Sequence, residues 1–64
     1  MPWTETRYPV AMKRLPPRVR AKAIEIANAL LEESHDEGMA IRVAIAQAKA
    51  WAARQGLASR ARDR

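Results

Sequence analysis

Two stretches of the chain repeat their apolar residues at the spacing of one helical face. The first stretch predicts a helix over residues 17–33, because its apolar positions recur at i, i+4, i+7, i+8 and i+11. Its apolar stripe consists of Val19, Ala23, Ile26, Ala27 and Leu30, widened by Ile24 and Leu31. Asn28 falls among the polar and charged positions that make up the rest of this stretch.

The second stretch predicts a helix over residues 36–55. Its apolar stripe consists of Ile41, Ala44, Ile45, Ala48, Trp51 and Ala52. Alanine is the best helix former, and its small side chain lets a neighbouring backbone come close. Gly56 follows directly and can adopt the left-handed conformation that ends many helices.

A short polar break separates the two predicted helices. Ser34 and Glu37 have the spacing of a capping box. In this motif each side chain accepts a hydrogen bond from the free backbone N–H of the other residue. Asp36 is the competing N-cap. We place Ser34 slightly ahead, with residues 35–37 forming the first helical turn.

The first fifteen residues have the pattern of an arm. Pro2 and Pro9 restrict the backbone, and Pro9 can open a short helical turn before Leu15-Pro16-Pro17 stops it. The sequence therefore predicts an all-α fold, with two amphipathic helices in a helical hairpin or a helix-turn-helix-like corner and the arm packed across them. We expect one domain over residues 1–56, with an arm at 1–15, and a flexible basic tail at 57–64.

The composition of the chain bears on the size of its core and on the compartment in which it works. A chain of 64 residues lies near the lower limit for a single core, and it has no cysteine for a disulfide or a thiolate metal site. The absence of cysteine fits a reducing cytoplasm, and we expect neither a signal peptide nor a membrane span. With two tryptophans, one tyrosine and no phenylalanine, either these rings matter greatly to the core or a second copy of the chain completes it.

Charge is arranged in three blocks along the chain. Residues 1–24 hold six basic residues and one acidic residue, residues 25–37 hold five acidic residues and no basic one, and residues 38–64 again hold six and one. Such a layout can bind anions at its ends, or can pair the middle of one molecule with the ends of another.

Catalytic and metal-binding chemistry is poorly supported by the sequence. Ser34, His35 and Asp36 are the residue types of a nucleophilic triad, but consecutive residues point in different directions. One histidine without cysteine is a weak zinc set, and two glycines cannot build a phosphate loop. We therefore expect no enzymatic activity, no cofactor and no metal.

Two sets of residues are candidates for contact with a partner. Trp3 and Tyr8 can anchor the arm or can contact a partner protein, and we favour the anchor for Trp3. Basic residues can contact nucleic acid through phosphate, which supplies most non-specific affinity. These residues are Lys13, Arg14, Arg18, Arg20, Lys22, Arg60, Arg62 and Arg64.

Several segments together resemble a group of short uncharacterised bacterial proteins, the YdaT-like proteins. The resemblance rests on Met1-Pro2-Trp3, Tyr8-Pro9-Val10-Ala11-Met12, Leu15-Pro16-Pro17-Arg18-Val19-Arg20, residues 22–33, Asp36-Glu37-Gly38 and Ala40-Ile41. A fainter similarity to the ChaB family of putative cation-transport regulators rests on the Leu-Pro start and on Ala50-Trp51. The resemblance implies a compact helical fold without an agreed activity and assigns no site. Ser34-His35 departs from the glycine expected in that turn.

These observations favour a small non-catalytic helical protein that acts as a protein-interaction or regulatory module. Its partner is an unknown protein or a second copy of the chain, because the second helix is rich in alanine and the charge blocks are complementary. The alternative is nucleic-acid binding through residues 13–22 and the C-terminal tail.

Overall fold

The chain folds into helices, in a computed structural model that describes residues 3–56. A short 3-10 helix, η1, spans Val10–Met12, and two α-helices follow, α1 at Pro17–Ser34 and α2 at Glu37–Arg54. Within the described range no strand forms, so the predicted all-α class is confirmed. The predicted basic tail at 57–64 lies outside the described residues.

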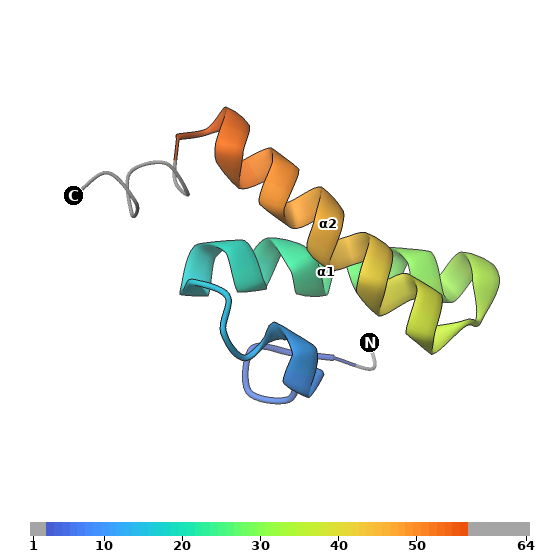
Figure 1. The fold of residues 1–64 in the computed structure, drawn as a ribbon. Coiled ribbons are helices and arrows are strands. Elements are labelled where there is room, and N and C mark those ends of the chain that lie inside the picture. Colours follow the sequence, from blue (N-terminus) through green and yellow to red (C-terminus); the bar gives the residue numbers. More distant parts are fainter. Residues whose placement is uncertain (1–2, 57–64) are drawn as a thin grey trace.

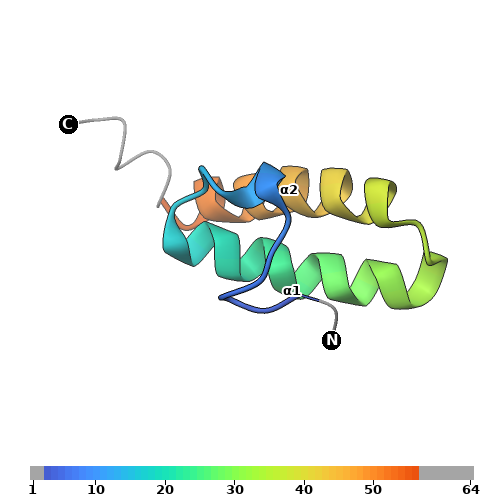
Figure 2. The same cartoon turned by 90° about the horizontal axis from the view of Figure 1, so that it is seen from below.

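The two long helices form a hairpin. They run in opposite directions side by side, and the arm crosses both of them on one side only (Figures 1 and 2). Of the two predicted arrangements the structure therefore has the hairpin and not the corner. The helices were predicted over 17–33 and 36–55, so the start of α1 agrees and the other three ends differ from the prediction by one residue.

Helix α1 begins at a proline pair and ends at a histidine. Pro16 is extended at the N-cap and Pro17 occupies the first turn, where a missing N–H costs nothing. His35 ends the helix with φ 61°, in the left-handed region, and its backbone N–H donates to the Leu31 carbonyl oxygen at 2.8 Å. This position favours glycine, so the histidine is held there at a cost in backbone energy.

Helix α2 begins at Asp36, and the predicted Ser34–Glu37 capping box is wrong. The Asp36 carboxylate accepts from the Met39 N–H at 3.0 Å. Ser34 instead belongs to α1, where its hydroxyl donates to the Leu30 carbonyl oxygen at 3.1 Å. The left-handed turn at His35 separates Ser34 from the start of α2, so the serine cannot reach the N–H groups that Asp36 caps. At the other end Gly56 has φ 79°, the left-handed conformation predicted for it.

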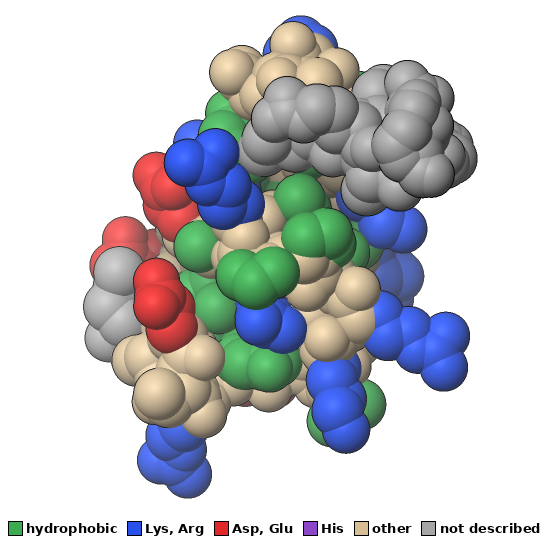
Figure 3. Space-filling model, turned by 90° about the vertical axis from the view of Figure 1, so that its left-hand side faces the viewer, with side chains coloured by type: hydrophobic (Ala, Val, Ile, Leu, Met, Phe, Trp, Pro, Cys, Tyr) green, Lys and Arg blue, Asp and Glu red, His purple; other side chains and the backbone are tan. Residues whose placement is uncertain are grey.

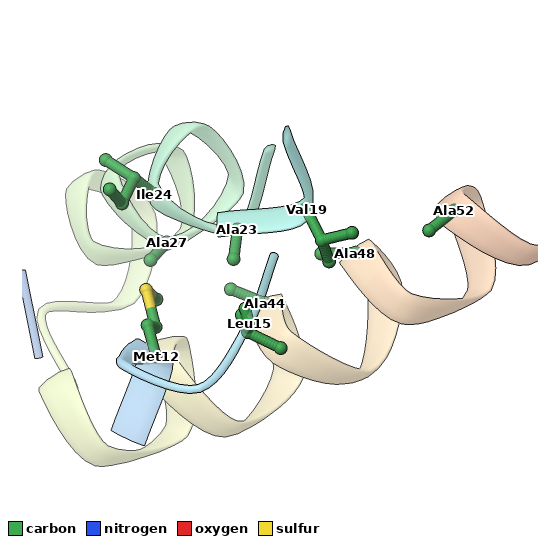
Figure 4. Close-up of a cluster of buried hydrophobic side chains, with 9 residues drawn as sticks. All are labelled: Met12, Leu15, Val19, Ala23, Ile24, Ala27, Ala44, Ala48 and Ala52. Carbon is green, nitrogen blue, oxygen red and sulfur yellow. The ribbon is translucent and has the colours of Figure 1, made fainter. Parts of the chain in front are cut away.

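Alanines line the seam between the two helices. Ala40, Ala44, Ala48 and Ala52 are fully buried along one edge of α2, at a spacing of four residues. Ala23 and Ala27 of α1 are equally buried (Figure 4). Because these side chains are small, the helices approach closely and bury little apolar area per residue.

The arm supplies the larger side chains of the core. Met12 is fully buried and Leu15 is 9% exposed, and both pack with Val19 and Ile24 of α1 against the seam (Figure 4). The arm therefore closes one side of the hairpin with the bulk that the alanines lack.

Several residues of the predicted stripes are only half-buried. Ile26 and Leu30 of α1, and Ile41, Ile45 and Trp51 of α2, fall into this class. Ala40 and Asn28, which lie outside the predicted stripes, take core positions instead, and Asn28 is only 4% exposed. The hairpin has only two layers, so residues at the borders of each stripe keep one side open. Neither helix within residues 3–56 is long and apolar enough to cross a membrane.

Candidate interaction surfaces

The arm is fastened to α1 by a pair of hydrogen bonds between Asn28 and the backbone of Trp3. The Trp3 N–H donates to Asn28 Oδ1 at 3.2 Å, and Asn28 Nδ2 donates to the Trp3 carbonyl oxygen at 3.0 Å. An amide side chain offers one donor and one acceptor, so it satisfies both backbone groups of a single residue. The arm therefore packs on its own chain.

A second fastening lies further along the arm. The Arg20 guanidinium lies 4.8 Å from the centroid of the Tyr8 ring, and its Nη1 donates to the Lys13 carbonyl oxygen at 3.3 Å. Between these fastenings Thr4 and Arg7 close a turn through two backbone hydrogen bonds, of 2.8 and 3.1 Å. Trp3 and Tyr8, the predicted partner-contact residues, are both half-buried against the core at this side of the hairpin.

The side of the hairpin away from the arm has its own cation–ring contact. Lys22 Nζ lies 5.5 Å from the centroid of the Trp51 ring and 3.6 Å from Glu25 Oε1. This arrangement ties α1 to α2 beside the seam. The Lys22 side chain is 31% exposed, so its ammonium group stays in reach of solvent and of a partner.

A shallow groove follows this contact along the interhelical seam. We call it the arm-free groove; it is lined by Lys22, Ile26, Gln47, Ala50, Trp51 and Arg54. Its apolar walls are the half-buried Ile26 and Trp51, and its two cations lie at the end where α1 begins and α2 ends. A half-buried tryptophan beside isoleucine and flanked by cations is a surface typical of protein contacts.

A second hollow lies at the same end of the molecule, where α1 begins. It is lined by Arg14, Leu15, Pro16, Val19, Lys49 and Ala52, and exposed Lys13 and Arg18 flank it in the sequence. We call this region the basic end. Figure 3 looks onto it and shows apolar side chains surrounded by Lys and Arg side chains, with Asp and Glu side chains on one side only.

The structure divides the basic residues predicted to bind nucleic acid. Lys13, Arg14 and Arg18 are exposed, whereas Arg20 and Lys22 are half-buried and engaged with Tyr8 and Trp51. Lys49 joins Arg14 at the basic end although 35 positions separate them in the sequence. Arg60, Arg62 and Arg64 lie outside the described residues.

Four of the five acidic residues of the middle block lie toward the opposite end, which we call the hairpin tip, residues 34–37. Ser34, His35 and Asp36 form the turn at this tip. Ser34 Oγ accepts from the Asp36 N–H at 3.3 Å, and the Asp36 carboxylate caps α2. No group of three or more His, Asp or Glu side chains is placed to hold a metal within residues 3–56.

Comparison with known proteins supports the predicted resemblance in part. Over 52 residues, 81% of this chain, the sequence is 50% identical to the uncharacterized protein YdaT of Bacillus subtilis (strain 168). The chain is similar to YdaT. It spans 35% of the length of that relative. Similarity to the ChaB family is not shown, no family model matches the chain, and no solved structure matches it.

Sequence reasoning missed three contributors to these surfaces. Asn28 looked like an ordinary polar position, and nothing in its neighbours signalled a partner 25 residues away. Gln47 and Ala50 were not expected to share a groove with Trp51, although Gln47 lies one helical turn before Trp51 and Ala50 directly precedes it. That spacing was the available signal.

Proposed function

We propose that this protein is a non-catalytic interaction module that binds a protein partner through the arm-free groove. The observation that carries the proposal is the one-sided closure of the hairpin. Met12 and Leu15 fill the arm side, whereas Ile26 and Trp51 line the arm-free groove on the other side and are only half-buried.

The energetics of the core support this proposal. The seam consists of alanines, which stabilise a fold less than larger side chains do because they bury less apolar area. A chain of this size has a small margin of stability. Covering Ile26 and Trp51 with a partner removes further apolar surface from water, so binding and folding reinforce each other.

A pull-down with matched variants tests the proposal. Ala50 lines the arm-free groove, whereas Ala46, one turn earlier, is exposed and is not among the residues that line it. The immobilised full chain, Ala50→Arg and Ala46→Arg are incubated with nuclease-treated lysate of the source cells. We expect one set of proteins to be retained by wild type and Ala46→Arg and lost with Ala50→Arg. Identical retention by both variants contradicts the proposal.

A second candidate function is nucleic-acid binding at the basic end. The specific observation in its favour is that the hairpin brings Lys49 beside Arg14, next to the exposed Lys13 and Arg18. Clustered cations can make several phosphate contacts together. The linear sequence did not indicate that Lys49 belongs to this cluster.

A gel shift on duplex DNA and on RNA tests this second candidate. Lys49→Gln removes a charge at the basic end, and Arg42→Gln removes one from an exposed position of α2 outside it. We expect binding at low salt that weakens with Lys49→Gln more than with Arg42→Gln and falls as salt rises. No binding at low salt, or equal effects of the two variants, contradicts it.

A further inference from the structure

We propose that the occupant of the arm-free groove is a second copy of this chain, packed antiparallel in a two-fold symmetric dimer. This inference rests on the proposed function, because it names the partner of the same surface. It is argued from the order of charged and apolar positions along the face of α1 that borders the groove.

Four residues of α1 form a symmetric row along that face. Lys22, Ile26, Ala29 and Glu33 follow one another at spacings of four, three and four residues, which keeps them on one side of a helix. Lys22 and Ile26 line the arm-free groove, and Glu33 lies two turns beyond Ile26 toward the hairpin tip.

The row is self-complementary under a half-turn. A two-fold axis across the row, between Ile26 and Ala29, brings Lys22 of one copy opposite Glu33 of the other. The same operation places the large side chain of Ile26 opposite the small one of Ala29. Lys22 and Glu33 are separated by roughly 16 Å along the helix at 1.5 Å per residue, so a pair forms at each end of the row.

Other charged residues near this face follow the same order, basic at one end and acidic at the other. Arg54 adds a second cation at the end of the groove where Lys22 lies, although Glu25 partly offsets it through its ion pair with Lys22. The hairpin tip adds Glu37 near the other end, and no basic residue occurs between positions 25 and 37. A parallel arrangement would set like charges against each other, which disfavours it.

An acidic helix of another protein would satisfy the cations but would leave Glu33 facing a like charge. A second copy pairs the cation at one end of the row and the carboxylate at the other, because an isologous contact uses the same surface on both subunits. The alanines on this side, Ala29 and Ala50, also allow close approach of a second helical layer.

Sedimentation equilibrium of the full chain across concentrations tests the inference with two matched pairs of variants. Ala50→Arg is compared with Ala46→Arg on α2, and Glu33→Lys with Glu32→Lys on α1. Glu32 makes the same change of charge one residue before Glu33, and it lies with Glu25, Asn28 and Ala29 around a separate hollow and not in the arm-free groove. Circular dichroism of every variant confirms that the helices remain.

We expect a concentration-dependent dimer that Ala50→Arg and Glu33→Lys each weaken by about tenfold or more, while their controls stay near wild type. A monomer at every concentration, or equal effects within each pair, overturns the dimer. The failure of the dimer can be told apart from the failure of the proposed function. If the chain is a monomer but Ala50→Arg alone still loses the captured proteins, the proposed function stands and the second copy is not the occupant.

Discussion

Asn28 of α1 holds the backbone of Trp3 with both ends of its side-chain amide, at 3.2 and 3.0 Å, across 25 positions of sequence. This contact fastens the start of the arm to the side of the hairpin that Met12 and Leu15 also fill. The arm leaves Trp51 and Ile26 on the other side, where they line the arm-free groove.

Replacing Asn28 tests how far this contact stabilises the fold. Asn28→Ala removes two hydrogen bonds and leaves the Trp3 N–H and carbonyl without their partner. We expect the free energy of unfolding to fall by about 1–3 kcal/mol in chemical denaturation. Gln47→Ala, which removes an exposed amide from the other side, is expected to change it by less than about 0.5 kcal/mol. Equal stability of the two variants would count against the role of Asn28.

The start of α2 gives a prediction that separates the two capping schemes. Asp36→Ala removes the acceptor of the Met39 N–H, so we expect a loss of about 1 kcal/mol in thermal or chemical unfolding. Ser34→Ala is expected to cost less, because its hydroxyl bonds a carbonyl of its own helix and does not cap α2. A larger loss for Ser34→Ala would restore the capping box.

The left-handed His35 predicts a stabilising substitution. His35→Gly relieves the strain of φ 61° and keeps the backbone hydrogen bond to Leu31. Strain relief outweighs the added freedom of glycine in the unfolded chain, so we expect a gain of about 0.5–1 kcal/mol. His35→Val, whose branched side chain fits this region poorly, should destabilise the fold. Unfolding curves in which His35→Gly loses stability would show that the turn is not left-handed.

The alanine seam predicts that added bulk is harmful only on its buried side. Ala48 is fully buried against α1, whereas Ala46 is exposed on the same helix. Ala48→Leu should force the helices apart and cost about 1–3 kcal/mol. Ala46→Leu should change stability by less than about 0.5 kcal/mol. Tolerance of leucine at position 48 would mean that the helices are not closely packed there.

The helices could be predicted from the sequence because their signals are local. Proline at the start of α1, glycine after α2 and the spacing of apolar residues act within a few residues of each other. The two-sided character of the hairpin could not be predicted in the same way. Ile24 and Ile26 belong to one apolar stripe, but Ile24 is buried on the side that the arm covers, and Ile26 is half-buried on the side that it leaves open.

The contacts that build the surfaces were not predictable either, because they join distant positions. The Asn28–Trp3 contact and the position of Lys49 and Arg14 around one hollow depend on how the arm and the hairpin pack. For the same reason Arg20 and Lys22 could not be separated from Lys13, Arg14 and Arg18 by charge alone. A cation over an aromatic ring looks the same in the sequence as one in solvent.

The central claim is that the arm closes one side of its own hairpin, and a paramagnetic label on the arm tests it most directly. The chain has no cysteine, so Glu5→Cys gives a single site for a nitroxide, beside Ala21 and Ile24. We predict that amide signals of Ala21 and Ile24 broaden far more than those of Gln47 and Ala50. A second sample mixes chains that carry the nitroxide but no isotope with isotope-labelled chains that carry no nitroxide. In this mixture the signals of Ala21 and Ile24 should stay sharp. Broadening centred on Gln47 and Ala50, or broadening of Ala21 and Ile24 in the mixture, would contradict the account.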